Sequence, residues 1–319
     1  MNRSKSCGRQ LRMHKIIVLG SVNMDFVIHT NRMPLAGESL IGHGSICNQG
    51  GKGANQAVAC KKLGGGEVVF LGAVGKDENG KKLIASLERY GVDVSHVLVK
   101  KEKSSGVCFI IIDEAHAENY LIVDTGANEC VSSEAVSAYI RATAQYGDVF
   151  LSQLEINLDA VTRGLQEAHK RGMFTILNPA PAQKIEKDVL NYVDLLVMNE
   201  TEAEFFSGVA VRELCDAERV HRYFSEFGVR ETVITLGSKG CFYVGDIVTH
   251  CPAKKIVAID PTSAGDTFIG ALALRKAQGY SVLSSLQFAN LCSALTVSRA
   301  GASESIPTAE EVYCFSSNE

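Results

Sequence analysis

The segment AIDPTSAGDTF (258–268) places a carboxylate, Asp266, directly after Gly265 at the start of a very apolar helix. The first backbone N–H groups of a helix have no partner within it, so this terminus attracts anions, above all phosphate. A carboxylate repels phosphate, and its presence is explained if it removes a proton from an attacking hydroxyl. The amides of Ala264, Gly265 and Asp266 would then stabilise the transferred phosphoryl group. Helix capping by Asp266 is the alternative interpretation.

The segment GSVNMD (20–25) follows a predicted strand and carries an amide and a carboxylate two residues apart. In an extended chain this spacing puts the side chains of Asn23 and Asp25 on one face. An amide and a carboxylate together can donate to and accept from a pair of sugar hydroxyls. Turn formation is the alternative role for both residues.

A glycine-rich segment, NQGGKGANQA (48–57), opens the next predicted helix. Its glycines let a ligand approach the backbone closely. Lys52 adds a positive charge, and Asn55 adds an amide that can both donate and accept hydrogen bonds. A P-loop requires Ser or Thr after its lysine, but Gly53 stands there, and no dinucleotide-binding glycine pattern follows the first strand. The sequence therefore favours phosphoryl transfer without a P-loop and argues against a dehydrogenase.

Three further strand ends carry polar groups. Glu155 ends the strand-like run 148–155, and Asn199 and Glu202 lie three residues apart at a strand-to-helix junction. The turn TLGSKG (235–240) has the glycines needed to pass under a nucleotide. Helix capping remains an alternative for Asn199 and Glu202, and a simple hairpin turn for residues 235–240.

These polar residues must be positioned by the elements before them, and strand and helix patterns alternate along the chain. Strands are predicted over 15–22, 67–75, 148–155, 174–180, 194–200 and 232–237, and helices over 51–64, 77–91, 133–145, 157–171 and 213–227. The alternation predicts one α/β domain over 15–319, with a central, mostly parallel sheet and helices on both faces. Ligands of such sheets collect outside the carboxyl ends of the strands.

Two stretches break the alternation. Residues 25–48 have an extended pattern, and residues 105–125 are typical of a hairpin around Asp113–Glu118. Together they predict a small β element apart from the main sheet. Such an element is expected to serve as a lid, with simple edge strands as the alternative.

The 319 residues, 46% hydrophobic and 21% charged, are ordinary for a globular protein with a large core. A net charge of −4 implies no attraction to nucleic acid or membrane surfaces, and no apolar run approaches the ~20 residues of a membrane span. The ten cysteines form no C-x-x-C pair and are expected to be reduced thiols in a cytoplasmic protein, with metal or disulfide use as alternatives. Residues 1–14 are expected to form a disordered basic extension, with an organellar presequence as the alternative.

In combination these motifs resemble the ribokinase-like carbohydrate kinase family over about residues 15–307. The resemblance rests on GSVNMD, GGKGANQA, QLE, NPAPA, NETEAE, ITLGSKG and AGDTF. It implies a three-layer α/β/α fold with a β-sheet lid that also forms a homodimer interface. It also implies transfer of the γ-phosphate of ATP to the 5-hydroxyl of D-ribose, giving D-ribose 5-phosphate and ADP.

The resemblance further implies a role for each matching residue. The implied sugar contacts are Asn23, Asp25, Gly51, Lys52, Asn55 and Glu155. Asp266 would be the general base and also touch the sugar, with Ala264 and Gly265 completing the anion hole. The implied nucleotide contacts are Asn199, Thr235, Leu236, Gly237, Ser238, Lys239, Gly240, Gly265 and Asn290. Glu202 would organise Mg²⁺ through water, since Mg²⁺ dehydrates reluctantly and prefers phosphate ligands.

The family also uses a monovalent cation, normally K⁺, beside the anion hole. The matching positions are Asp260, Thr262, Thr296, Arg299, Gly301 and Ser305. The family usually reads D-T-x-[AG]-A-G-D here, but this chain has Pro261, which removes an N–H and fixes φ near about −65°. We expect K⁺ activation to persist but to be weak.

Two other functions stay open at this point. A deoxyribokinase, or another sugar or nucleoside kinase of this kind, would share nearly all the motifs. A sugar-binding regulatory protein without catalysis is the alternative from another class. Against it, the chain retains Asp266, Gly265, Lys52 and Glu202.

Overall fold

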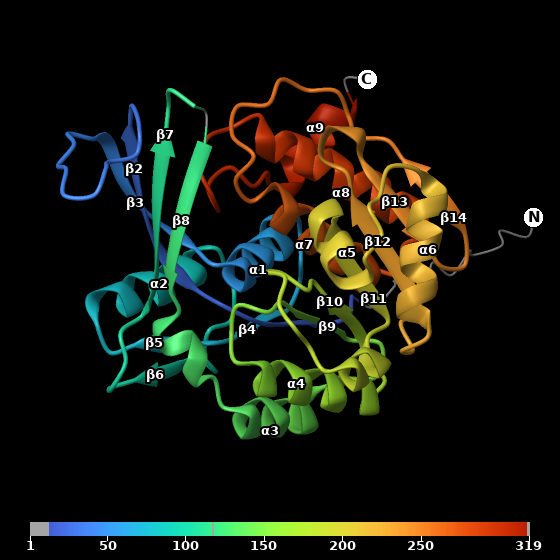
Figure 1. Ribbon diagram of the computed structural model, residues 1–319. Helices are drawn as coiled ribbons and strands as arrows, with labels where there is room; N and C mark the ends of the chain where they lie inside the picture. The colour runs from blue at the N-terminus through green and yellow to red at the C-terminus, as the bar shows by residue number, and fades with distance from the viewer. Residues whose placement is uncertain (1–12, 117, 318–319) are drawn as a thin grey trace, which may run out of the picture.

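The computed structural model describes residues 13–116 and 118–317 (Figure 1). Its largest sheet has eight strands in the order β14-β13-β12-β11-β10-β9-β1-β4. These are β1 (Ile16–Leu19), β4 (Val68–Leu71), β9 (Val149–Ser152), β10 (Phe174–Leu177), β11 (Leu195–Asn199), β12 (Glu231–Thr235), β13 (Cys241–Val244) and β14 (Val248–Cys251). Neighbours from β12 to β4 pair in parallel, and β13 and β14 are antiparallel. The predicted mostly parallel sheet is confirmed.

Helices cover both faces because successive side chains of each central strand point into two different cores. Ile16 and Val18 of β1 belong to one core, and Ile17 and Leu19 to the other. The first core is covered by α1 (Lys52–Lys62), α2 (Glu78–Arg89), α7 (Ala264–Ala277), α8 (Val282–Val297) and α9 (Ala309–Ser317). The second is covered by α3 (Ser133–Thr143), α4 (Leu158–Lys170), α5 (Glu200–Ser207) and α6 (Leu214–Ser225). The expected three-layer α/β/α arrangement is therefore confirmed.

A separate four-stranded sheet, called the small sheet below, stands apart from the main sheet at the left of Figure 1. Its strands, in the order β3-β2-β7-β8, are β2 (Asn23–Thr30), β3 (His43–Gly50), β7 (Gly106–Asp113) and β8 (Glu118–Asp124). The predicted hairpin is present, with Asp113 paired to Glu118. Only residues 20–22 separate β1 from β2, so the small sheet starts at the carboxyl edge of the main sheet.

The run 67–75, predicted as one strand, is two strands. β4 ends at Leu71, and β5 (Ala73–Gly75) pairs with β6 (Leu98–Lys100) in a two-stranded sheet. The break falls at Gly72, where an added methyl group would lie 2.6 Å from Cε1 of Phe70 and 2.9 Å from the carbonyl oxygen of Gly20. This crowding requires glycine and turns the chain away from the main sheet.

None of the described helices has the length and hydropathy that a transmembrane span requires. The predicted basic extension over residues 1–14 lies outside the described residues, apart from Met13 and His14. The amide of His14 already donates to the carbonyl of Ala277 at 3.1 Å.

Candidate active site

Two neighbouring hollows lie at the carboxyl ends of the parallel strands, and Lys52, Asn199 and Glu202 line both. The first is further lined by residues of the β12 end and the α7 start, among them Thr235, Ser263, Gly265 and Asp266. The second is further lined by small-sheet and neighbouring residues, among them Asn23, Leu121, Val123, Asn128 and Glu155. The site therefore extends from the end of β12 to the face of the small sheet, as the positions of the polar strand ends predict.

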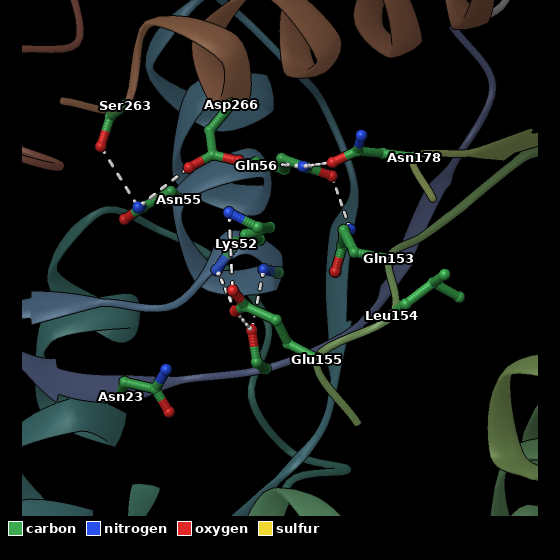
Figure 2. A network of polar contacts seen from close by, with 12 residues as sticks. Asn23, Lys52, Asn55, Gln56, Gln153, Leu154, Glu155, Asn178, Ser263 and Asp266 are labelled. Atoms are coloured by element: carbon green, nitrogen blue, oxygen red, sulfur yellow. Dashed lines mark hydrogen bonds and ion pairs between the residues drawn. The ribbon is translucent and has the colours of Figure 1, made fainter. Parts of the chain in front are cut away.

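Asp266 lies in the first turn of α7, and its carboxylate is held by side chains of α1. Its Oδ2 accepts from Nδ2 of Asn55 at 3.1 Å, and its Oδ1 from Nε2 of Gln56 at 3.0 Å (Figure 2). The N-cap of α7 is Ser263, which has φ 60°. Helix capping therefore does not account for the acid at position 266.

The backbone at the start of α7 is open towards the first hollow. Gly265 is exposed, and apart from its chain neighbours and the backbone of its own helix no heavy atom of the described residues lies within 4 Å of the place a methyl group would take there. The turn before it is closed by the amide of Ala264, which donates to the carbonyl of Pro261 at 3.2 Å. Pro261 is thus accommodated without loss of the helix start, which leaves free space above the first amides for an anion.

Lys52 and Glu155 form the centre of the site. Nζ of Lys52 lies 3.5 Å from Oε1 of Glu155, and the backbone N–H of Lys52 donates to Oε2 at 3.1 Å. The hydroxyl of Ser21 donates to the same Oε2 at 2.6 Å. Glu155, which follows β9, therefore accepts a hydrogen bond from the first residue of α1. This contact was not predicted from the sequence.

Asn23 and Asp25 are brought to the same side of the site, on β2. Oδ1 of Asn23 accepts from Nδ2 of Asn128 at 2.8 Å, and Oδ1 of Asn128 accepts from the amide of Val22 at 3.1 Å. Asn128, which the sequence analysis missed, thus fixes the start of β2. Turn formation does not explain Asn23 and Asp25, because both lie within a strand.

The glycines of segment 48–57 were predicted to let a ligand approach, but the structure shows that they are needed for close packing within the protein. A methyl group at Gly50 would overlap the carboxylate of Asp25, and one at Gly53 would lie 2.6 Å from Cα of Gly20. At Gly51, which has φ 90°, it would lie 2.8 Å from Cα of Val22. The glycines let α1 pack against the chain between β1 and β2, which sets Lys52 and Asn55 at the site.

Four carboxylates surround the single ammonium of Lys52. Burial, and then repulsion by Glu155 and Asp266, raise the pKa of Asp25 to about 7. Burial also raises the pKa of Asp266 and of Glu202. Burial lowers the pKa of Lys52, but attraction to Glu155, Asp266 and Glu202 outweighs it and leaves that pKa raised. The excess of negative charge favours a cation or a hydroxyl-rich ligand in this space.

Asn199 and Glu202 form a capping box at the start of α5. Oδ1 of Asn199 accepts from the amide of Glu202 at 2.8 Å, and Oε2 of Glu202 accepts from the amide of Asn199 at 2.9 Å. The capping alternative is thus confirmed for both residues. Both side chains still line the hollows, so capping and ligand binding do not exclude each other.

Residues 235–240 form the turn that joins β12 to the antiparallel β13. The amide of Leu236 donates to the carbonyl of Gly240 at 2.8 Å, and Gly237 and Gly240 have φ 54° and 97°. The hairpin alternative is therefore confirmed. Asn290 lines neither hollow, and its buried amide donates to the carbonyl of Cys251 at 3.0 Å.

Asp260 ties together two loops beside the start of α7. Its Oδ2 accepts from the amide of Gly301 at 3.0 Å, and its Oδ1 from the amide of Thr262 at 2.8 Å. The guanidinium of Arg299 pairs with Glu311 at 2.9 Å. The hydroxyl of Thr296 bonds Thr267 at 3.0 Å inside the core, and that of Ser305 donates to the carbonyl of Ala302 at 2.7 Å.

Comparison with known proteins shows the family and the fold to which this chain belongs. The model of the pfkB family of carbohydrate kinases matches residues 13–309. A ribokinase of Schizosaccharomyces pombe is 41% identical over 314 residues, covering 94% of this chain and 97% of the relative. The crystal structure of a Thermotoga maritima ribokinase has a TM-score of 0.85 at 32% identity and covers 96% of this chain and 100% of its own. That of an Arabidopsis thaliana ribokinase complexed with ribose and ATP has a TM-score of 0.86 at 27% identity and covers 94% and 98%. The chain belongs to the pfkB family of carbohydrate kinases.

Proposed function

We propose that this carbohydrate kinase transfers the γ-phosphate of ATP to the 5-hydroxyl of D-ribose, giving D-ribose 5-phosphate and ADP. The observation that carries the proposal is the Asp266 carboxylate at a hollow beside the open backbone of Gly265 at the start of α7. The similarity to ribokinases over nearly the whole chain, one of them complexed with ribose and ATP, supports this substrate pair.

Asp266 takes the proton of the attacking hydroxyl, and the amides of Gly265 and Asp266 stabilise the charge on the moving phosphoryl group. The amide of Ala264, which already donates to the carbonyl of Pro261, takes part through a shared, three-centre hydrogen bond. The sugar is held by Asn23, Asp25, Gly51, Lys52, Asn55 and Glu155. Burial raises the pKa of Asp266 and so makes its carboxylate a stronger base than an exposed aspartate.

ATP lies along the ends of β11 and β12, over Asn199 and the turn from Thr235 to Gly240. Asn290 acts from behind this site, by holding the carbonyls of Cys251 and Pro252. Mg²⁺ accompanies the nucleotide and neutralises charge on its phosphates. Among the described residues no group of three or more His, Cys, Asp or Glu is arranged to hold a metal. This fits Mg²⁺, which keeps its waters and takes phosphate ligands, with Glu202 reaching it through water.

K⁺ binds beside the anion hole, between two loops. One loop carries Asp260 and Thr262, and the other carries Arg299, Gly301 and Ser305. The bond from Gly301 to Asp260 already joins these loops. Several of these residues act through carbonyl oxygens, because the hydroxyls of Thr296 and Ser305 are engaged inside the protein and the guanidinium of Arg299 has no lone pair for a cation. Rates measured in K⁺ are expected to exceed those in Na⁺ at equal ionic strength, and equal rates would contradict this cation site.

The protein forms a homodimer through the small sheet, which also serves as the lid. Ile122 on β8 is 62% exposed, and Phe109, its cross-strand neighbour on β7, is 49% exposed, so both present apolar surface on the same face of the sheet. Apolar surface of this extent on one small sheet is typical of an interface. Light scattering should give a dimer for the protein and a monomer for Ile122→Asp, with Val99→Asp on β6 as control. A monomeric wild-type protein would contradict the proposal.

The experiment that tests the activity is ADP release from ATP and Mg²⁺ with a panel of sugars. We expect turnover with D-ribose, and a lower kcat/KM with 2-deoxyribose because buried polar groups lose a partner, which costs about 1–3 kcal/mol. A higher kcat/KM with 2-deoxyribose would make the protein a deoxyribokinase. Sugar binding without ADP release would favour the regulatory alternative.

A further inference from the structure

The Asp266 carboxylate is held from α1 by two amides, of which only one can reach a substrate. Asn55 is at the edge of the site, next to Ser263, and its hydrogen bond reaches Oδ2. Gln56, the next residue, is 0% exposed and holds Oδ1. Since no surface of Gln56 is open to a ligand, its contact with the acid is its only link to the chemistry.

Gln56 is itself fixed by two further buried amides (Figure 2). Its Oε1 accepts from Nε2 of Gln153, and its Nε2 donates to Oδ1 of Asn178 at 3.3 Å as well as to Asp266. Nδ2 of Asn178 is anchored on the carbonyl of Val197 at 3.0 Å. With its oxygen taken by a donor, Gln56 has one amide orientation, and its N–H₂ must face the acid.

The amide of Gln153, which orients Gln56, is enclosed by the protein. Gln153 is 0% exposed, and its Oε1 has no hydrogen-bond partner among the described residues. A buried polar atom without a partner is destabilising. Gly20 leaves room for this oxygen, because a methyl group there would overlap it. The backbone at Gly20 thus makes room for the amide that orients Gln56.

We propose that Gln56, oriented by Gln153, is a positioning residue that fixes the Asp266 carboxylate for proton abstraction. The inference rests on the proposed function. The donor from Gln56 holds one carboxylate oxygen in place and favours the ionised form of the acid, which burial disfavours. Other charged groups around Asp266 are Lys52 on α1, Asp25 on β2, Glu155 after β9 and Glu202 on α5.

The test is Gln56→Met, which keeps length and removes the donor, with D-ribose, ATP and Mg²⁺. We expect kcat to fall about tenfold to a hundredfold, as for loss of a hydrogen bond to a charged group, with the KM for both substrates within about threefold of wild type. The acidic limb of the pH profile of kcat/KM should move to higher pH, because the carboxylate loses a donor to its ionised form. Gln153→Met should move both quantities in the same direction by less.

The matched control is Gln287→Met, the same replacement on the exposed side of α8, which should leave rate and pH profile unchanged. A Gln56→Met protein with a lower melting temperature but the wild-type pH limb and kcat would overturn the proposal and leave Gln56 with a packing role. If Gln56→Met fails to fold, Gln153→Met decides by the same two readouts. Wild-type activity in the same assay separates these outcomes from failure of the proposed function, which would show as no turnover of ribose in any variant.

Discussion

The replacement Asp25→Asn should stabilise the protein and at the same time impair its reaction. Burial and the repulsion of Glu155 and Asp266 raise the pKa of Asp25 from 3.8 to about 7. A pKa difference of one between the folded and the unfolded chain corresponds to about 1.4 kcal/mol, so the rise from 3.8 to about 7 corresponds to about 4 kcal/mol. Part of this cost relaxes locally, and we expect a gain of about 2–4 kcal/mol in the free energy of unfolding at pH 8.

The sign of the pH dependence follows from the raised pKa. Above pH 7 Asp25 is ionised in the folded chain, and its unfavourable burial lowers the free energy of unfolding by the full amount. As the pH falls from 7 towards 4 the protein becomes more stable, because Asp25 takes up a proton in the folded state at a higher pH than in the unfolded state. The advantage of Asp25→Asn should therefore shrink to less than half between pH 8 and pH 5. Urea unfolding of wild type and variant at both pH values measures it, with Glu88→Gln on the exposed side of α2 as control.

Two results would refute this reasoning. One is an Asp25→Asn protein that is no more stable than wild type at pH 8, which would mean that the carboxylate is well solvated or paired. The other is a stability gain of the same size at both pH values, which would assign the effect to packing rather than to charge. In the kinase assay the variant should also lose kcat/KM for ribose, since a charged hydrogen bond to the sugar is worth roughly tenfold to a hundredfold.

Three further predictions concern the glycines and the ammonium of the site. Gly53→Ala should lower the free energy of unfolding by about 1–3 kcal/mol in denaturant, because its methyl group would lie 2.6 Å from backbone of Gly20; unchanged stability would contradict the close packing of α1. Gly265→Ala should keep the melting temperature but lower kcat, because its methyl group would enter the open space above the anion hole; a wild-type kcat would place the phosphoryl group elsewhere. Lys52→Met should move the acidic limb of the kcat/KM profile to higher pH, since Lys52 lowers the pKa of Asp266; an unmoved limb would show that the two groups do not interact.

Most of the framework was predictable because its signals are local. Apolar runs of four to eight residues followed by helical patterns predicted the parallel strands and the three layers. The strand at 67–75 was misjudged because the break at Gly72 depends on crowding by Phe70 and Gly20 rather than on any turn residue. The position of Asp266 in the first turn of a helix was predicted from the residues around Gly265 and is confirmed, while its role as the base stays a prediction.

What could not be predicted are contacts between residues far apart in the sequence. Gln56 and Gln153 are 97 residues apart, and Asn23 and Asn128 are 105 apart, so no spacing rule links them. The glycines at 50, 51 and 53 were predicted to allow a close approach to the backbone. The sequence alone cannot tell whether the group that approaches is a ligand or another part of the backbone, because both require glycine. Only the fold shows that the neighbour is the chain between β1 and β2.

The most direct test of the central claim is the turnover of Asp266→Asn with D-ribose, ATP and Mg²⁺. Asparagine keeps the size of the side chain but cannot take a proton. The rate is expected to fall by about 10²–10⁴, and the dissociation constant for ATP to stay close to that of the wild-type protein. A variant that turns over ribose at nearly the wild-type rate would show that Asp266 is not the base.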